Sequence, residues 1–143
     1  MIEIVQLQPL HLLEIQMQAA QAGELQSGAD LLAHGVRLCQ RGMAFTVLRE
    51  GRPVAAGGLV EVQSHYATAW ALVGSDAGPA MTAMTRAVRR VIAARAYERV
   101  DLTVRADFEA GQRWAWLLGF EKVATLRKWG PDRSDYTLYE KVI

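Results

Sequence analysis

The loop at positions 74–79 and the helix expected after it form the part of the sequence best suited to chemistry. An apolar stretch at 68–73 leads into this Gly- and Pro-containing loop, and an amphipathic pattern then runs over 80–96. Where a strand ends and a helix begins, free backbone N–H groups and the helix dipole favour an anion. Gly78 suits the cap of such a helix and Pro79 its first position. The stretch therefore predicts an anion-binding turn.

Basic residues along the same predicted helix either strengthen an anion site or face water. The apolar stripe of the helix consists of residues at helical spacing: Met81, Met84, Val88, Val91 and Ile92. The arginines lie mostly off that stripe or just beyond the helix: Arg86, Arg89, Arg90, Arg95 and Arg99. They could form an anion-binding patch, although charged residues on an amphipathic helix usually form its solvated face. Both interpretations stay open.

Side chains that bind metals are few and scattered. His11 and His34 have no second ligand at a metal-binding spacing, so we expect no metal site. Cys39 is the only cysteine, which excludes an intramolecular disulfide and a metal–thiolate cluster and fits a reducing compartment. Chemistry that needs a resident metal is therefore not expected.

Length and charge limit the class of protein. With 143 residues the chain should form one domain, 1–143, that buries about 70% of the surface exposed by its unfolded form. The 16 basic and 15 acidic side chains nearly cancel, so we expect no nucleic-acid or anionic-membrane partner. Positions 1–5 lack a cationic lead and no apolar run approaches about 18 residues, so neither a signal peptide nor a membrane span is expected. These features predict a cytoplasmic protein.

The whole chain predicts strands and helices joined by short connections. Period-two alternation indicates strands, and three- and four-residue spacing indicates helices. The expected strands are 2–7, 43–48, 54–62, 66–73, 100–104, 120–129 and 136–142. A first helix is expected from Pro9 until Gly23 stops its pattern, and further helices are expected over 29–40, 80–96 and 108–118. Residues 50–53 should form the turn of an antiparallel hairpin. Because the helix at 80–96 joins two strands as a right-handed crossover, we expect 68–73 and 100–104 to be parallel and to diverge at Val73, leaving a notch beside the helix start.

Small residues mark two places where another group should come close. The Gly57-Gly58 pair inside a predicted strand indicates either a bulge or a close approach by another backbone. The strand at 66–73 alternates bulky and small side chains, so one of its faces is smooth: Ala67, Ala69, Ala71 and Val73. That face either admits a ligand arm or, as is more common, seats the following helix.

The order of these elements, with several local motifs, resembles the GNAT superfamily of acyl-CoA-dependent N-acetyltransferases over essentially the whole chain. The strongest local match is 110–120, which ends in Leu118-Gly119-Phe120. The hairpin segment 51–58 is similar to the family's second and third strands. The resemblance implies an α+β fold in three layers: a single GNAT-like domain with a mixed, mostly antiparallel sheet, one parallel strand pair and helices on both faces.

The resemblance also implies acetyl-CoA as the cofactor, because the family's loop before the long helix holds the CoA pyrophosphate with backbone amides. The matching positions are 75–80, and the implied cofactor-binding residues are Leu72, Val73, Gly78, Ala80, Met81, Thr82 and Arg86. Gly78 and Ala80 keep the small size that close approach requires. By contrast, Ser75 replaces Gln or Arg, Asp76 adds a negative charge, and Pro79 removes an N–H donor. Each lost charge-assisted hydrogen bond to phosphate would cost on the order of 1.5–3 kcal/mol, so a weakened or absent phosphate cradle is expected.

Catalytic residues follow only from the same resemblance. The reaction needs an amine deprotonated near the thioester, N–H donors for the oxyanion and a proton for the thiolate. Glu61, late in one strand, and Tyr66, at the start of the next, are the candidates for base or water relay, with His65 between them. Their ordinary roles would be a solvated strand end and a packed aromatic ring. Phe108 and Ala115 stand where many members have Asn and the Tyr that protonates the thiolate, so the catalytic acid is not carried over.

Other features resemble a narrower group, the small GNAT-like proteins of tailed phages that include internal virion protein A. These features are Trp70-Ala71-Leu72, the loop with Pro79, the arginine-rich helix, and the stretch from Trp114 to Phe120 followed by Arg127 and Gly130. They imply an alternative: a catalytically inert protein that contacts phage structural proteins in virion assembly or in the virion, and is found in the host cytoplasm or the particle. An enzyme would instead acetylate a small-molecule or protein amine. Exposure of Trp116 or Trp129 would favour a protein-contacting role.

Overall fold

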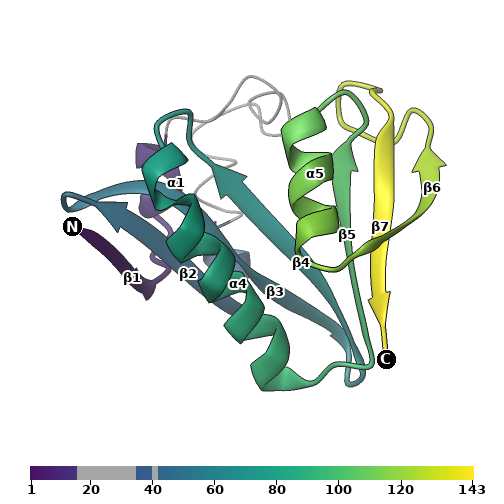
Figure 1. Cartoon of the computed structure of the whole chain (residues 1–143), viewed down its shortest axis with the longest axis horizontal. Helices are drawn as coiled ribbons and strands as arrows, with labels where there is room; N and C mark the ends of the chain where they lie inside the picture. Colours follow the sequence, from purple (N-terminus) through teal and green to yellow (C-terminus); the bar gives the residue numbers. More distant parts are fainter. Residues whose placement is uncertain (16–34, 40–41) are drawn as a thin grey trace.

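A computed structural model describes residues 1–15, 35–39 and 42–143 and contains one seven-stranded sheet (Figure 1). The strands are β1 (Ile2–Gln6), β2 (Gly42–Arg49), β3 (Arg52–Gln63), β4 (Tyr66–Val73), β5 (Arg99–Arg105), β6 (Glu121–Leu126) and β7 (Tyr136–Val142). Their order across the sheet is β1-β2-β3-β4-β5-β7-β6. Neighbouring strands are antiparallel except β4 and β5, which are parallel. The predicted mixed sheet with one parallel pair is therefore confirmed.

Helices cover both faces of the sheet. The described helices are α1 (His11–Glu14), the 3-10 turn η1 (Gly78–Ala80), α4 (Met81–Arg95) and α5 (Glu109–Leu117), and residues 35–39 are also helical. In Figure 1, α4 crosses one half of the sheet and α5 covers the half that contains β5 and β7. Most of the two helices predicted after β1 lies outside the described residues. No helix within the described ranges is long and apolar enough to cross a bilayer.

The β2–β3 hairpin turns more tightly than the sequence predicted. Glu50 and Gly51 alone form the turn, with positive φ values of 51° and 77°. Arg52 and Pro53 already belong to β3, where Arg52 lies opposite Arg49. Two residues with positive φ match the right-handed twist of the flanking strands, and this is why such short turns join hairpins.

Gly58 is required by a neighbouring backbone. A Cβ atom at this position would lie 2.0 Å from the carbonyl oxygen of Met43 on β2. The irregularities of β3 lie elsewhere, opposite the Val47/Leu48 step and between Glu61 and Gln63. Of the two interpretations of the glycine pair, close backbone approach is correct and a bulge at this position is wrong.

The parallel strands β4 and β5 separate earlier than expected. They pair only from Tyr66 opposite Arg99 to Thr68 opposite Asp101, so the divergence begins after Thr68 and not at Val73. Beyond Thr68 each of the two strands keeps only the neighbour on its other edge. Throughout its length β4 stays paired with β3, and β5 stays paired with β7.

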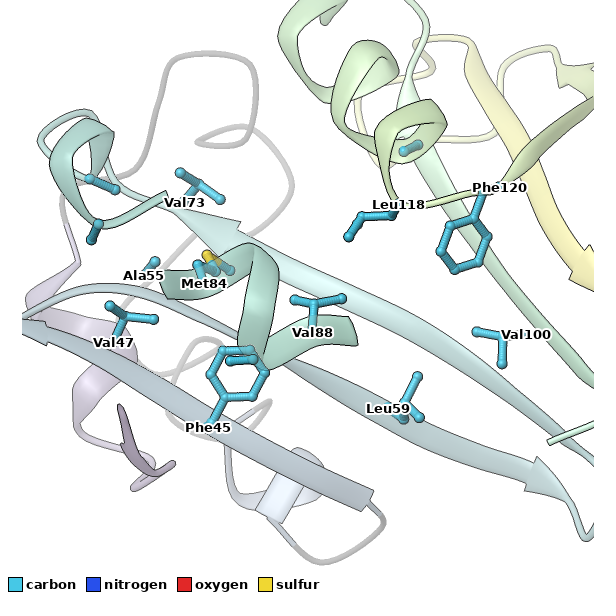
Figure 2. Close-up of a cluster of buried hydrophobic side chains, with 14 of the residues drawn as sticks. Phe45, Val47, Ala55, Leu59, Val73, Met84, Val88, Val100, Leu118 and Phe120 are labelled. Atoms are coloured by element: carbon cyan, nitrogen blue, oxygen red, sulfur yellow. The ribbon is translucent and has the colours of Figure 1, made fainter. Parts of the chain in front are cut away.

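The smooth face of β4 seats α4. Ala67 and Val73 belong to the main buried cluster together with Met84 and Val88 of α4. In Figure 2 Met84 lies between Val73 and Phe45, and Val88 lies between Met84 and Leu59. The same cluster includes the following residues of the α5 region: Ala115, Leu118 and Phe120. A second cluster on the other side joins Leu72 of β4 to Leu12 of α1, so both sheet faces are buried against helices.

Candidate acetyl-CoA cavity

A cavity of about 860 Å³ lies where β4 and β5 diverge. Its walls come from β4, β5, α4 and α5, and are mostly apolar: examples are Ala71 of β4, Leu102 of β5, Ile92 of α4 and Trp114 of α5. Its volume falls within the range of about 300–1,000 Å³ that is typical of small-molecule sites. The predicted notch is therefore present, and it extends between the two helices.

The cavity contains some of the predicted cofactor residues and not others. Those on its wall are Leu72, Val73, Gly78 and Met81. Ala80 is instead buried in the main core, 1% exposed. Thr82 and Arg86 lie on the solvent-exposed side of α4 and do not contribute to the wall. The CoA-binding role of all seven residues stays a prediction.

The loop between β4 and α4 uses many of its own N–H groups. The amide of Gly74 donates to Val54 O at 2.8 Å, and that of Ala77 donates to Gly74 O at 3.1 Å. Further on, Ala80 N donates to Ala77 O and Met81 N donates to Gly78 O. Pro79 has no N–H at all. Because these donors are already engaged, the loop resembles a tight turn more than an open cradle.

Gly78 nonetheless leaves room for a ligand. It lies on the cavity wall together with Ser75, and a Cβ atom added to Gly78 would meet nothing within 4 Å. The predicted helix start needs a small correction, since η1 occupies 78–80 and α4 begins at Met81. The space beside the Gly78 Cα atom is therefore open.

Asp76, between these two wall residues, faces away from the cavity. Its Oδ2 atom lies 2.7 Å from Nη2 of Arg52, and its carbonyl oxygen accepts a hydrogen bond from Nη1 of Arg49 at 3.3 Å. Asp76 itself is not part of the wall. The negative charge that the sequence placed in this loop is thus paired with the β2–β3 hairpin.

The predicted catalytic pair lies outside the cavity. Glu61 is exposed and accepts a 2.7 Å hydrogen bond from the hydroxyl of Tyr97. Burial raises the pKa of the Tyr97 hydroxyl, and this bond raises it further. Tyr66 donates its hydroxyl to Oδ2 of Asp101 at 2.5 Å, at the end of the sheet where β4 and β5 are still paired. His65 is exposed. The geometry therefore brings neither candidate base to the cavity, and their catalytic roles stay predictions without structural support.

Asp101 is a buried carboxylate that the sequence did not single out. It is 8% exposed and accepts hydrogen bonds from Tyr66, from Thr68 at 2.8 Å and from Arg99 at 3.4 Å. Arg99 also donates to Glu140 at 2.6 Å and lies over the Tyr66 ring. This cluster joins β4 to β5 at the closed end of the cavity. Only the parallel register, which places Thr68 opposite Asp101, could have revealed it.

Hydrogen bonds and close packing hold α5 against the cavity. Its Trp114 Nε1 donates to Oγ1 of Thr85 on α4 at 3.0 Å. Gln112 donates to the carbonyl oxygen of Arg105 at 2.9 Å and to Oγ1 of Thr137 at 3.1 Å. Arg89 of α4 donates to Leu117 O at 3.1 Å, at the last turn of α5. The wall formed by α5 is therefore anchored to α4, β5 and β7.

The cavity offers little acid or base chemistry. In the described part of the chain, Arg105 and Tyr136 are its only titratable wall residues, and it has no carboxylate, imidazole, thiol or amine. Arg105 is held by Asp107 and Asp132, each at 2.8 Å. Phe108 and Ala115 both lie on the wall, so apolar side chains stand at the two positions where many members of the family that the sequence resembles have polar ones. No cluster of three potential metal ligands occurs among the described residues.

Two tryptophans are exposed, as a protein-contacting role would require. Trp116 is 74% exposed on α5, and Trp129 is 55% exposed beyond β6. The Trp129 ring lies against Tyr136, with 5.2 Å between ring centroids, and it borders the cavity. Trp116 does not contribute to the cavity wall.

Comparison with known proteins identifies the fold. No protein-family model and no curated protein matches the chain in sequence. Among solved structures, it is similar to a ribosomal-protein-alanine N-acetyltransferase from Brucella melitensis, with a TM-score of 0.79, 18% identity and 99% coverage of both chains. The chain has the GNAT acetyltransferase fold. An acetyltransferase of the GNAT family from Streptococcus pneumoniae matches with a TM-score of 0.70, 13% identity and coverage of 100% of this chain and 99% of that one.

The similar structures differ in what their names say they acetylate. A spermidine N-acetyltransferase chimera of SpeG from Vibrio cholerae and hSSAT matches with a TM-score of 0.73 and 13% identity, over 99% of this chain and 95% of that chain. At such identities the GNAT similarity establishes the fold and leaves the acceptor open. None of these three structures is named as a phage protein, so they lend no support to the narrower phage resemblance.

Proposed function

We propose that the protein is an acetyl-CoA-dependent N-acetyltransferase with an unknown amine as acceptor. The observation that carries this proposal is the cavity of about 860 Å³ at the divergence of β4 and β5, which reaches the β4–α4 loop at Ser75 and Gly78. The GNAT fold adds to the argument, because the family that the sequence resembles holds the CoA pyrophosphate at the loop before the long helix. A partner amine on a small molecule or a protein would enter the same space.

The residues of the cavity would divide the work between binding and exclusion of water. The peptides around Ser75 and Gly78, at the start of α4, would face the phosphates. The β4 edge at Leu72 and Val73 would lie beside the pantetheine arm, and the apolar walls would keep water from the thioester. Acetyl-CoA would supply the acetyl group as a thioester. The amine nitrogen forms the new bond to the acetyl carbon while the carbon–sulfur bond breaks.

The proton balance distinguishes this cavity from one with a built-in base. The attacking amine must lose a proton and the leaving thiolate must gain one. Since the described wall holds no carboxylate or imidazole, we expect the amine to arrive uncharged and, on attack, to pass its proton to the departing thiolate. Turnover should then follow the ionisation of the acceptor itself.

Ligand-dependent melting tests the proposal directly. Acetyl-CoA should raise the melting temperature, because a ligand that binds only the folded state stabilises it. Gly78→Trp should abolish that rise, since the new ring would fill the open space beside the loop. Ala94→Trp, on an exposed part of α4 outside the cavity wall, is the matched control and should keep it. If millimolar acetyl-CoA does not raise the melting temperature, the proposed acetyltransferase function is refuted.

A second candidate is a GNAT-like protein without catalysis that works through protein contacts, as in phage assembly. The exposed Trp116 and the lack of carboxylate, imidazole, thiol and amine groups on the described cavity wall favour it. Aromatic side chains are enriched at interface hot spots. Turnover of acetyl-CoA by an isolated monomer would count against this candidate. Genes for portal, tail or capsid proteins beside this one would favour it.

A further inference from the structure

The β2–β3 hairpin holds the β4–α4 loop through two arginines. Arg49 and Arg52 lie opposite each other at the end of the hairpin. Arg52 pairs with the carboxylate of Asp76 at 2.7 Å, while Arg49 donates to the carbonyl oxygen of the same residue at 3.3 Å. One loop residue is therefore held by its side chain and by its backbone.

Asp76 depends on Arg52 for its charge pairing. Its Oδ1 atom is buried and has no hydrogen-bond partner in the described part of the chain, so the Arg52 contact satisfies the carboxylate through Oδ2 alone. The Asp76 side chain is 24% exposed, which leaves water limited access to replace a lost partner. A buried, unpaired carboxylate is costly, so without Arg52 it would turn toward another donor.

Besides Arg49, which already donates to the Asp76 carbonyl oxygen, the donors next to Asp76 in this loop include the ones that an anion would use. Asp76 lies between Ser75 and Gly78, and both of these line the cavity. Aspartate side chains readily accept a hydrogen bond from the backbone N–H two residues later, which is the Gly78 amide in this loop. A carboxylate at that place would also sit at the positive end of α4, where negative charge is stabilised.

We propose that Arg52 is a positioning residue that keeps the Asp76 carboxylate away from the anion-binding turn. With Arg52 in place, the loop charge is paired at the hairpin and the peptides at Ser75 and Gly78 stay available to a phosphate group of the ligand. Without it, Asp76 occupies the Gly78 amide and repels the phosphate. This inference rests on the proposed acetyl-CoA site and adds a residue that lies outside its wall.

Calorimetric titration of four proteins tests the inference: wild type, Arg52→Gln, Asp76→Ala and the double variant. Arg52→Gln should weaken acetyl-CoA binding by roughly ten- to a hundredfold, as expected when one charge-assisted hydrogen bond to phosphate is lost. Removing Asp76 as well should restore affinity to within about twofold of Asp76→Ala. Acetylpantetheine, which has no phosphate, should bind all four proteins equally. Arg113→Gln, an exposed arginine of α5 outside the cavity, should change nothing.

The outcomes separate this inference from the proposed function. If the wild type binds and Arg52→Gln binds equally well, the inference is overturned. It is also overturned if Arg52→Gln binds weakly and the double variant does not recover, because Arg52 would then act on the ligand or the fold. A wild type that does not bind overturns the proposed function. In that case NMR still tests the contact between Asp76 and Gly78. The backbone N–H resonance of Gly78 should move in Arg52→Gln relative to wild type, and an unchanged resonance refutes the contact.

Discussion

The indole of Trp114 donates a hydrogen bond to the hydroxyl of Thr85 across 3.0 Å, and this joins α5 to α4 on either side of the cavity. The same hydroxyl donates to the carbonyl oxygen of Met81 at 2.8 Å. Since Met81 and Trp114 both line the cavity, the chain of hydrogen bonds runs from one wall to the other.

Trp114→Phe should therefore lower the free energy of unfolding by about 1–3 kcal/mol, because it removes this hydrogen bond and part of a packed ring. Urea denaturation measures the change. Trp116→Phe is the matched control, because Trp116 is 74% exposed and its replacement should stay within about 0.5 kcal/mol of wild type. Equal effects of the two substitutions would contradict the role given to Trp114.

Gly111→Ala should destabilise the protein although alanine favours helices. A Cβ atom at Gly111 would lie 2.8 Å from Cγ1 of Val104 on β5 and 2.8 Å from Cδ2 of Phe108. Overpacking of this kind costs about 1–3 kcal/mol. Thermal unfolding measures the change, and Gly78→Ala is the control. A Cβ atom at Gly78 would meet nothing within 4 Å, so this substitution should leave the stability nearly unchanged. A Gly111→Ala protein as stable as wild type would show that α5 can move away from β5.

Asp101→Asn should weaken the closed end of the cavity. The buried carboxylate accepts hydrogen bonds from Tyr66, Thr68 and Arg99, and an amide can accept only part of these while adding donors of its own. Loss of a buried charged partner should reduce the free energy of unfolding by about 2–4 kcal/mol. Asp107→Asn, at a carboxylate 71% exposed, should change it by less than about 0.5 kcal/mol. Hydrogen exchange at Val100 and Ala67 should quicken in Asp101→Asn and stay unchanged in Asp107→Asn.

Asp132 should titrate at unusually low pH. The Ser134 hydroxyl, the Ser134 backbone N–H and Arg105 all favour its charged form, and they lower its pKa from 3.8 to about 2. Because the folded pKa is depressed, the stabilisation is fully present above about pH 4 and is lost as the pH falls toward 2. NMR titration of the Asp132 carboxyl carbon should show this, and Ser134→Ala should move its pKa upward. A normal pKa in the wild type would rule out the hydrogen bonds to Ser134.

The rate of acetylation should rise with pH until the acceptor amine itself is uncharged. The described cavity wall supplies no carboxylate or imidazole that could act as a base, so no earlier plateau is expected. Measurement of kcat/KM against pH, with two amines of different pKa, should give two curves displaced by the difference between those amines. A common plateau that disappears in Glu61→Gln would instead establish Glu61 as the base.

The sequence by itself determined the order of the elements and the general architecture. Alternation with period two marked the strands, helical spacing marked α4, and the crossover between β4 and β5 required a parallel pair. The hairpin and the cavity beside α4 followed from the same patterns. These features depend on local periodicity and on the handedness of the chain, and both are written in short stretches of sequence.

Only the tertiary structure decided which residues meet at the cavity. It moved the divergence of the strands to Thr68, and beyond this point β4 continues beside β3 and β5 beside β7. It also placed Glu61 beside Tyr97 and paired Asp76 of the β4–α4 loop with Arg52 of the β2–β3 hairpin. These contacts join positions far apart in the chain, and strand register and packing bring them together. No local pattern encodes contacts between such distant positions. The sequence therefore predicted the β4–α4 loop but not Arg52, the residue that pairs with it.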